Sequence, residues 1–189
     1  MTNKNRAPVV NTLNFAPSFG VAGLTQCSFN ASSSDSAGDA ITYAWDIAGN
    51  PFTGTNGTVT FVNGFDGIAR VTVTDSKGAT ATDTRTFVVG TMSGSWLVTT
   101  GPLLGSTFNL SQSATGLVTG TFNLPGIGNG NTDPAQPGRM TAAAQLTMRI
   151  KIGPFTDFNM IGTMDATGRV VSGNLQGSGF SGQPFTMVK

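Results

Sequence analysis

The stretch ITYAWDIAGN (residues 41–50) alternates apolar and polar residues and ends in small and polar residues. Alternation with a period of two is typical of a β-strand with one buried face. Ile41, Tyr43, Trp45 and Ile47 share the face that we expect to point inward. Because an indole ring is large enough to fill the middle of two packed sheets, this stretch predicts a central strand of a β-sandwich.

The residues on either side of this strand repeat the pattern. Further inward faces are expected at Cys27, Phe29 and Ala31, at Val59 and Phe61, and at Ala69, Val71 and Val73. The segment DSKG, Asp75 to Gly78, is typical of a hairpin turn in which glycine supplies a positive φ. About six or seven short strands of this kind predict a small β-sandwich in residues 1–90.

The order of these pieces resembles the polycystic-kidney-disease (PKD) repeat, an immunoglobulin-like module. The resemblance rests on CSFNASSSD, AITYAWDIAG and VTVTDSKGAT and covers residues 7–90. The family pattern usually continues W-D-F-G-D-G, whereas this chain has WDIAGN from Trp45 to Asn50, so the second aspartate is lost. The resemblance implies a non-catalytic module, found mostly in surface and secreted proteins, that serves as a spacer or a contact surface.

Several aspartates of this half lie at predicted strand ends or in loops, and they are the candidates for a calcium site. They are Asp35, Asp39, Asp46 and Asp75. Aspartate is also common in turns because its carboxylate accepts backbone hydrogen bonds, which is the alternative role for these residues. The lost second aspartate argues against calcium at the turn after Trp45, since affinity for calcium grows with the number of carboxylates.

Residues 91–189 contain longer alternating segments joined by short turns, which predicts an antiparallel β-meander or a small up-and-down β-barrel. Within them, residues 124–140 show no periodicity and predict a long loop. The start, Gly94 to Trp96 followed by LGSTFNLSQ, resembles the first hairpin of avidin and lipocalin barrels. That resemblance implies that Lys189 packs over Trp96, but not that biotin is bound, because the tryptophan-rich interior of avidins is missing.

Apolar side chains of this half form either a packed core or the lining of a cavity for a small apolar ligand. The ligand-binding candidates are Trp96, Phe158, Met160 and Phe180, in a set that also includes Phe155, Met164, Phe185 and Met187.

The composition excludes several functions. Charged residues make up 10% of the chain and the net charge is +1, which argues against nucleic acid as a partner. The chain has no histidine and one cysteine, so nucleophile–histidine pairs and zinc catalysis are excluded. Catalysis by a pair of aspartates, as in glycosidases, is the mechanism that this composition leaves open. Since no other proton-transfer group for neutral pH is present, we expect a protein that is not an enzyme and needs no cofactor, with calcium as the one candidate ion.

These observations predict an all-β, non-catalytic binding or adhesion protein that contacts extracellular glycans or protein surfaces. The alternatives are a carrier of a small apolar ligand and a self-associating structural subunit of a filament or virion. No apolar run is long enough to cross a membrane as a helix. The N-terminal segment MTNKNRAPVVN lacks the apolar part of a signal peptide, and we expect a secreted or cell-surface protein whose signal has been removed.

Overall fold

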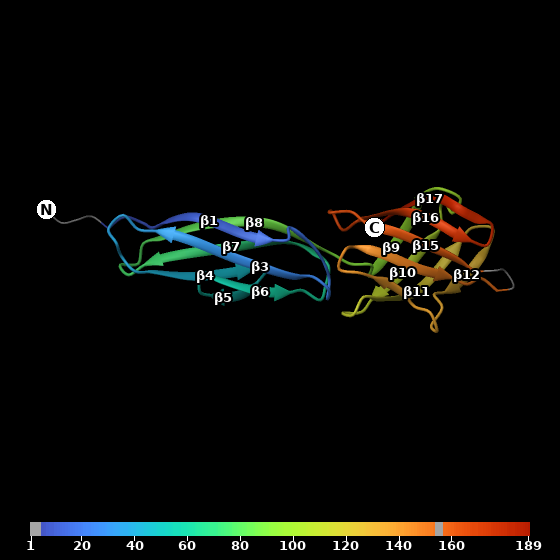
Figure 1. Ribbon diagram of the computed structural model, residues 1–189, viewed down its shortest axis with the longest axis horizontal. Helices are drawn as coiled ribbons and strands as arrows, with labels where there is room; N and C mark the ends of the chain where they lie inside the picture. The colour runs from blue at the N-terminus through green and yellow to red at the C-terminus, as the bar shows by residue number, and fades with distance from the viewer. Residues whose placement is uncertain (1–4, 154–156) are drawn as a thin grey trace. The chain divides into compact units, whose positions relative to one another are not determined.

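The computed structural model describes residues 5–153 and 157–189, and every helix or strand assigned in these ranges is a β-strand (Figure 1). The all-β fold class predicted from the alternation is confirmed. The described residues form two compact units. The first lies within Met1–Ser18, Gln26–Thr60 and Phe65–Val88, and the second consists of Phe19–Thr25, Phe61–Gly64 and Val89–Lys189. No helix with the length and hydrophobicity needed to cross a membrane occurs in the part of the chain that the structure describes.

The N-terminal strands form two sheets, as a sandwich requires. Among the described residues, one sheet has the order β1 (Val9–Ala16), β3 (Gln26–Ser34), β6 (Asn56–Thr60). The other, within the same ranges, has the order β2 (Phe19–Val21), β8 (Thr80–Gly90), β7 (Phe65–Asp75), β4 (Ile41–Ile47), β5 (Asn50–Thr53). The predicted turn DSKG joins β7 to β8, and Gly78 has a φ of 86° there.

The core of the sandwich is built around the tryptophan of β4. Trp45 and Ile47 are buried, and the Trp45 ring centroid lies 4.7 Å from that of Phe29 on the opposing sheet. The indole N–H donates a hydrogen bond of 2.9 Å to the carbonyl of Gly54, so the polar part of the side chain is also satisfied. Tyr43 is only half-buried, because its hydroxyl reaches Ser33 at the edge of the core, with 2.6 Å between the two oxygens.

The C-terminal strands form a closed barrel. Eight strands of the described residues pair in a ring, and the pairing of β10 with β11 closes it. In ring order they are β10 (Thr107–Gln112), β9 (Gly94–Thr100), β17 (Phe180–Val188), β16 (Val170–Gly177), β15 (Phe158–Met164), β14 (Gln145–Ile150), β13 (Gly138–Met140) and β11 (Leu117–Leu124). A further strand, β12 (Gly128–Asn131), pairs with the second half of β11. The prediction of a meander or small barrel is confirmed, and the structure decides for the barrel.

The prediction of one long loop at residues 124–140 is wrong in part, because β12 and β13 lie inside it. The strand pattern was hidden because a glycine takes an inward-facing place. Gly130 lies opposite Phe122, and a Cβ on Gly130 would come within 2.6 Å of Cζ of that ring. The ring of Phe122, on the neighbouring strand, occupies the space next to Gly130. The segment GNGN therefore has no hydrophobic alternation of its own.

Candidate functional site

The apolar ligand-binding candidates of the barrel lie in its packed core. Trp96, Phe158 and Met160 are each at most 3% exposed, and half-buried Phe180 packs against them with its ring centroid 5.1 Å from that of Phe158. Met164, Phe185 and Met187 are buried in the same cluster, whereas Phe155 lies outside the described residues. The structure thus brings these side chains together as members of one buried hydrophobic cluster.

Lys189 covers the end of this core, as the barrel resemblance implied. Its Nζ lies 5.8 Å from the centroid of the Trp96 ring, a distance at which an ammonium group is attracted to the ring face. The Trp96 indole N–H donates to the carbonyl of Met92 at 2.8 Å. Partial burial, and to a lesser degree the charge of Arg169, lowers the pKa of Lys189. This arrangement holds Trp96 in place.

The structure brings together three of the four calcium candidates. Carboxylate oxygens of Asp35, Asp39 and Asp75 all lie within 4.8 Å of one another. Asp46 is not among them, because it lies at the other end of β4, where it accepts a 2.7 Å hydrogen bond from the N–H of Gly49. Asp46 lines a separate hollow of about 340 Å³ that includes Arg70.

Asp75 organises the turn in which the cluster lies. Its carboxylate accepts hydrogen bonds from the backbone N–H groups of Lys77 and Ala79, both at 2.9 Å, and from the side-chain amide of Asn5 at 3.0 Å. Burial alone would raise the pKa of Asp75, but these hydrogen bonds outweigh it and the pKa is lowered. Lys77 also reaches Asp39 with 2.9 Å between nitrogen and oxygen, and this hydrogen bond raises the pKa of Lys77.

Two buried oxygen atoms of this region have no hydrogen-bond partner among the described residues. They are Oδ2 of Asp35 and Oδ1 of Asn5. A buried polar atom without a partner is costly, so such an atom suggests a ligand that the protein itself does not supply. Carboxylate and amide oxygens are the donors that calcium prefers, and the residues present therefore fit that ion.

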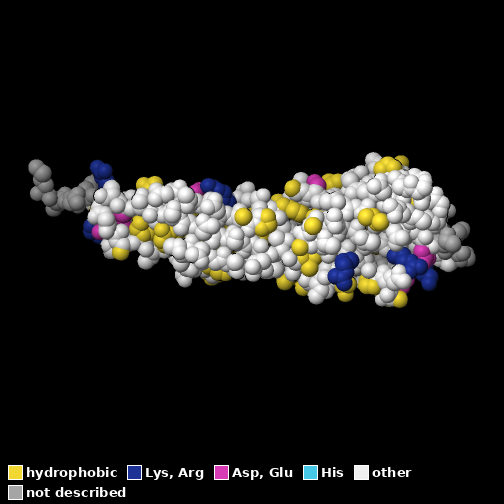
Figure 2. Space-filling model, viewed as in Figure 1, with side chains coloured by type: hydrophobic (Ala, Val, Ile, Leu, Met, Phe, Trp, Pro, Cys, Tyr) yellow, Lys and Arg dark blue, Asp and Glu magenta, His cyan; other side chains and the backbone are white. Residues whose placement is uncertain are grey.

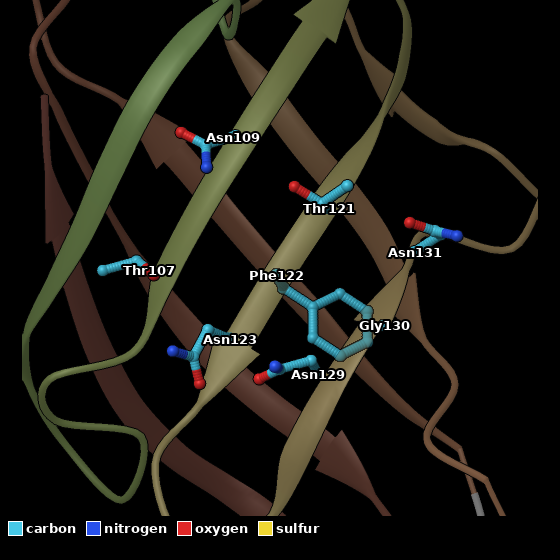
Figure 3. A pocket seen from close by; sticks show the side chains of 8 residues that line it. All are labelled: Thr107, Asn109, Thr121, Phe122, Asn123, Asn129, Gly130 and Asn131. Carbon is cyan, nitrogen blue, oxygen red and sulfur yellow. The ribbon is translucent and has the colours of Figure 1, made fainter.

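Sequence reasoning missed a third site, on the outer face of the barrel. A hollow of about 400 Å³ lies over β10, β11 and β12 (Figure 3). It is lined by Thr107, Asn109, Thr121, Phe122, Asn123, Asn129, Gly130 and Asn131. The signal in the sequence was the polar half of the alternation in TFNLS, TGTFN and GNGN, which carries only hydroxyl and amide side chains.

Strand register places these polar side chains in two rows across the sheet. Asn109, Thr121 and Asn131 form one row, and Thr107, Asn123 and Asn129 form the other. Phe122 and Gly130 lie between the rows, so the polar residues border the hollow on both sides, as Figure 3 shows.

The amides of this face are largely free. Asn109 accepts a hydrogen bond from the hydroxyl of Ser95, with 2.6 Å between the oxygens. The side chains of Asn123, Asn129 and Asn131, all exposed, make no hydrogen bond to another described residue.

The strands that form and flank the hollow, β9 to β12, carry no charged side chain. In the parts of β9 to β12 that face outward, the described side chains are hydroxyl, amide or aliphatic, as the segments SWLVT, TFNLS, TGTFN and GNGN show. Leu97 lies opposite Thr107 at the end of one row and is 44% exposed. On the face that Figure 2 draws, charged side chains lie in small groups and most of the surface is neither charged nor hydrophobic.

The fold and these sites define a two-unit, all-β protein with polar surface sites and apolar cores. No family model and no curated protein sequence matches the chain. Among solved structures, the PKD1 domain of Vibrio anguillarum Epp is 32% identical, with 46% of this chain and 96% of that domain covered and a TM-score of 0.38. The PKD1 domain of the Vibrio cholerae metalloprotease PrtV is 29% identical, with 44% of this chain and 98% of that domain covered and a TM-score of 0.38.

A third similar structure is described as a carbohydrate-binding module of the β-sandwich superfamily. It is 18% identical, with 98% of this chain and 92% of that chain covered and a TM-score of 0.44. The family recognised in residues 7–90 is confirmed by the identity and coverage of the first domain, and the N-terminal part of this chain belongs to the PKD domains.

Proposed function

We propose that this protein is a non-catalytic binding protein of the cell surface or extracellular space that contacts neutral polysaccharide through uncharged sheet faces. The observation that carries the proposal is the outer face of β9 to β12, where exposed amide and hydroxyl side chains stand in register without a charged neighbour on the same strands. Amides and hydroxyls both donate and accept hydrogen bonds, so they match sugar hydroxyls, which do the same.

The sheet β1-β3-β6 supports this proposal with a face of the same kind. Asn14, Asn30 and Asn56 align across its three strands, and all are exposed. Here the amides partly satisfy one another, since Asn14 donates to Asn30 at 3.0 Å. Neutral polar faces on both units suit a neutral polymer better than a phosphate-bearing or acidic one, which is bound through cations.

We expect the protein to be retained by insoluble neutral polysaccharides in a depletion assay, and to be retained much less by polyanionic gels. Because no ion pair contributes at these faces, retention should change little when the salt concentration is raised. Loss of binding at high salt would contradict the proposal. So would a failure to bind any neutral polysaccharide, and concentration-dependent assembly in light scattering would then favour the structural-subunit alternative.

Calcium binding in the first unit is a second candidate function. It is favoured by the two buried oxygens without partners, on Asp35 and Asn5, next to the carboxylates of Asp39 and Asp75. The ion would add positive charge beside three carboxylates that now face the single ammonium group of Lys77, which is paired with Asp39. It would tie the segment before β1 to the turn between β7 and β8.

Millimolar calcium is therefore expected to raise the melting temperature of the protein relative to a chelator. Binding that favours the folded state contributes about 1.4–2.7 kcal/mol at ten to a hundred times the dissociation constant, which is a shift on the order of 5 °C or more. Asp35→Asn should remove the shift, and Lys77→Met should enlarge it by leaving Asp39 without its cation.

Asp46→Asn is the matched control, because Asp46 also caps a turn of the same unit but lies outside the cluster. Its calcium shift should equal that of the unchanged protein. A wild-type melting temperature that does not respond to calcium would remove the candidate.

A further inference from the structure

We infer that the hollow over β10, β11 and β12 is the polysaccharide-binding site, and that it takes a neutral glycan along the length of its chain rather than by its end. This inference rests on the proposed function and adds the site and the form of its ligand.

The first argument is the unused hydrogen-bonding capacity of the hollow. Asn123, Asn129 and Asn131 project from strands, yet their amides have no partner among the described residues. By contrast, the amide of Asn50 in the first unit donates to the carbonyls of Ile47 and Ala48 and has a structural role. The amides at the hollow are therefore available to a ligand.

The second argument is the rigidity of the arrangement. Neighbouring strands are roughly 4.8 Å apart, and side chains two residues apart on one strand are separated by roughly 6.6 Å. The rows therefore form a regular grid of donors and acceptors at spacings comparable to the distances between hydroxyls of adjoining sugar units. Because β11 is hydrogen-bonded to β10 on one side and to β12 on the other, the backbone positions from which these side chains project are fixed before the ligand arrives, which limits the entropy lost on binding.

The third argument is the one-sided shape of the site. All of its lining residues come from three adjacent strands, and its hydroxyl and amide side chains project from the outer face of the sheet, as Figure 3 shows, so a ligand is contacted from one side. A socket for the end of a glycan needs walls around the terminal sugar. At the end of one row, Leu97 adds an exposed aliphatic surface suited to the C–H face of a sugar ring.

The test uses the full chain and the neutral polysaccharide that retains it best. We expect the double variant Asn123→Ala with Asn129→Ala to bind about tenfold or more weakly, because each lost hydrogen bond contributes on the order of 1 kcal/mol. Thr121→Val, which keeps the shape and removes the hydroxyl, should weaken binding by a smaller factor. Oligosaccharides of the same polymer should compete better as they lengthen, and the monosaccharide should compete poorly.

Asn174→Ala is the matched control. Asn174 is an exposed asparagine on β16, the strand that lies opposite β11 in the ring, and its loss should leave binding within about twofold. If the double variant, shown to be folded by circular dichroism, binds like the wild type, the inference is overturned while the proposed function stands. Strong competition by the monosaccharide overturns the lengthwise mode of binding. If the wild type itself binds no neutral polysaccharide, the proposed function fails as well.

Discussion

Replacing Trp96 by alanine is expected to lower the free energy of unfolding of the barrel by about 3–5 kcal/mol, the usual cost of truncating a buried tryptophan. The side chain is 1% exposed in the barrel core, donates a hydrogen bond to Met92 and lies beneath the ammonium group of Lys189. The substitution leaves a cavity, removes the hydrogen bond and exposes the core that the lysine covered.

The measurement is urea unfolding followed by circular dichroism and by fluorescence. The chain has two tryptophans, so in this variant the tryptophan fluorescence comes from Trp45 alone and follows the unfolding of the first unit. The barrel transition should move to lower urea, while the Trp45 signal should keep its midpoint if the units unfold separately. Leu97→Ala, an exposed neighbour on the same strand, is the control and should cost less than about 1 kcal/mol. If the Trp96→Ala variant had the same free energy of unfolding as the Leu97→Ala control, the core would not depend on the indole.

The second large effect is expected for Trp45→Ala, which should destabilise the sandwich by about 3–5 kcal/mol. Trp45 is 3% exposed, contacts the ring of Phe29 on the opposing sheet and donates to the carbonyl of Gly54. In this variant the tryptophan fluorescence comes from Trp96 and follows the unfolding of the barrel. Each of the two substitutions therefore leaves a fluorescent probe in the unit that is not altered. Thr42→Ala, at an exposed position of the same strand, is the control and should leave the free energy of unfolding nearly unchanged. If Thr42→Ala and Trp45→Ala lowered the free energy of unfolding equally, the role assigned to the indole would be contradicted.

Much of the fold could be predicted because alternation is a local property of the chain. Phe29 and Trp45 could be assigned to facing interiors since each lies in a segment whose apolar residues recur every second position. The segment 128–131 could not, because Gly130 makes room for the ring of Phe122, a residue of another strand. The exclusion of Asp46 from the carboxylate cluster could not be predicted either. Its sequence context resembles that of Asp35, although the two lie at opposite ends of the unit.

The sequence by itself determined that both halves are β-sheets, which side chains face inward, and that no histidine is available for acid–base chemistry at neutral pH. Only the tertiary structure decided that β11 returns to β10 and closes the barrel, that Asp39 and Asp75 meet beside Asp35, and that amides from three strands form one outer face. The physical reason is that the direction of a side chain follows from the geometry of its own strand. Which strands become neighbours, and in what register, is set instead by packing between residues that are distant in the chain.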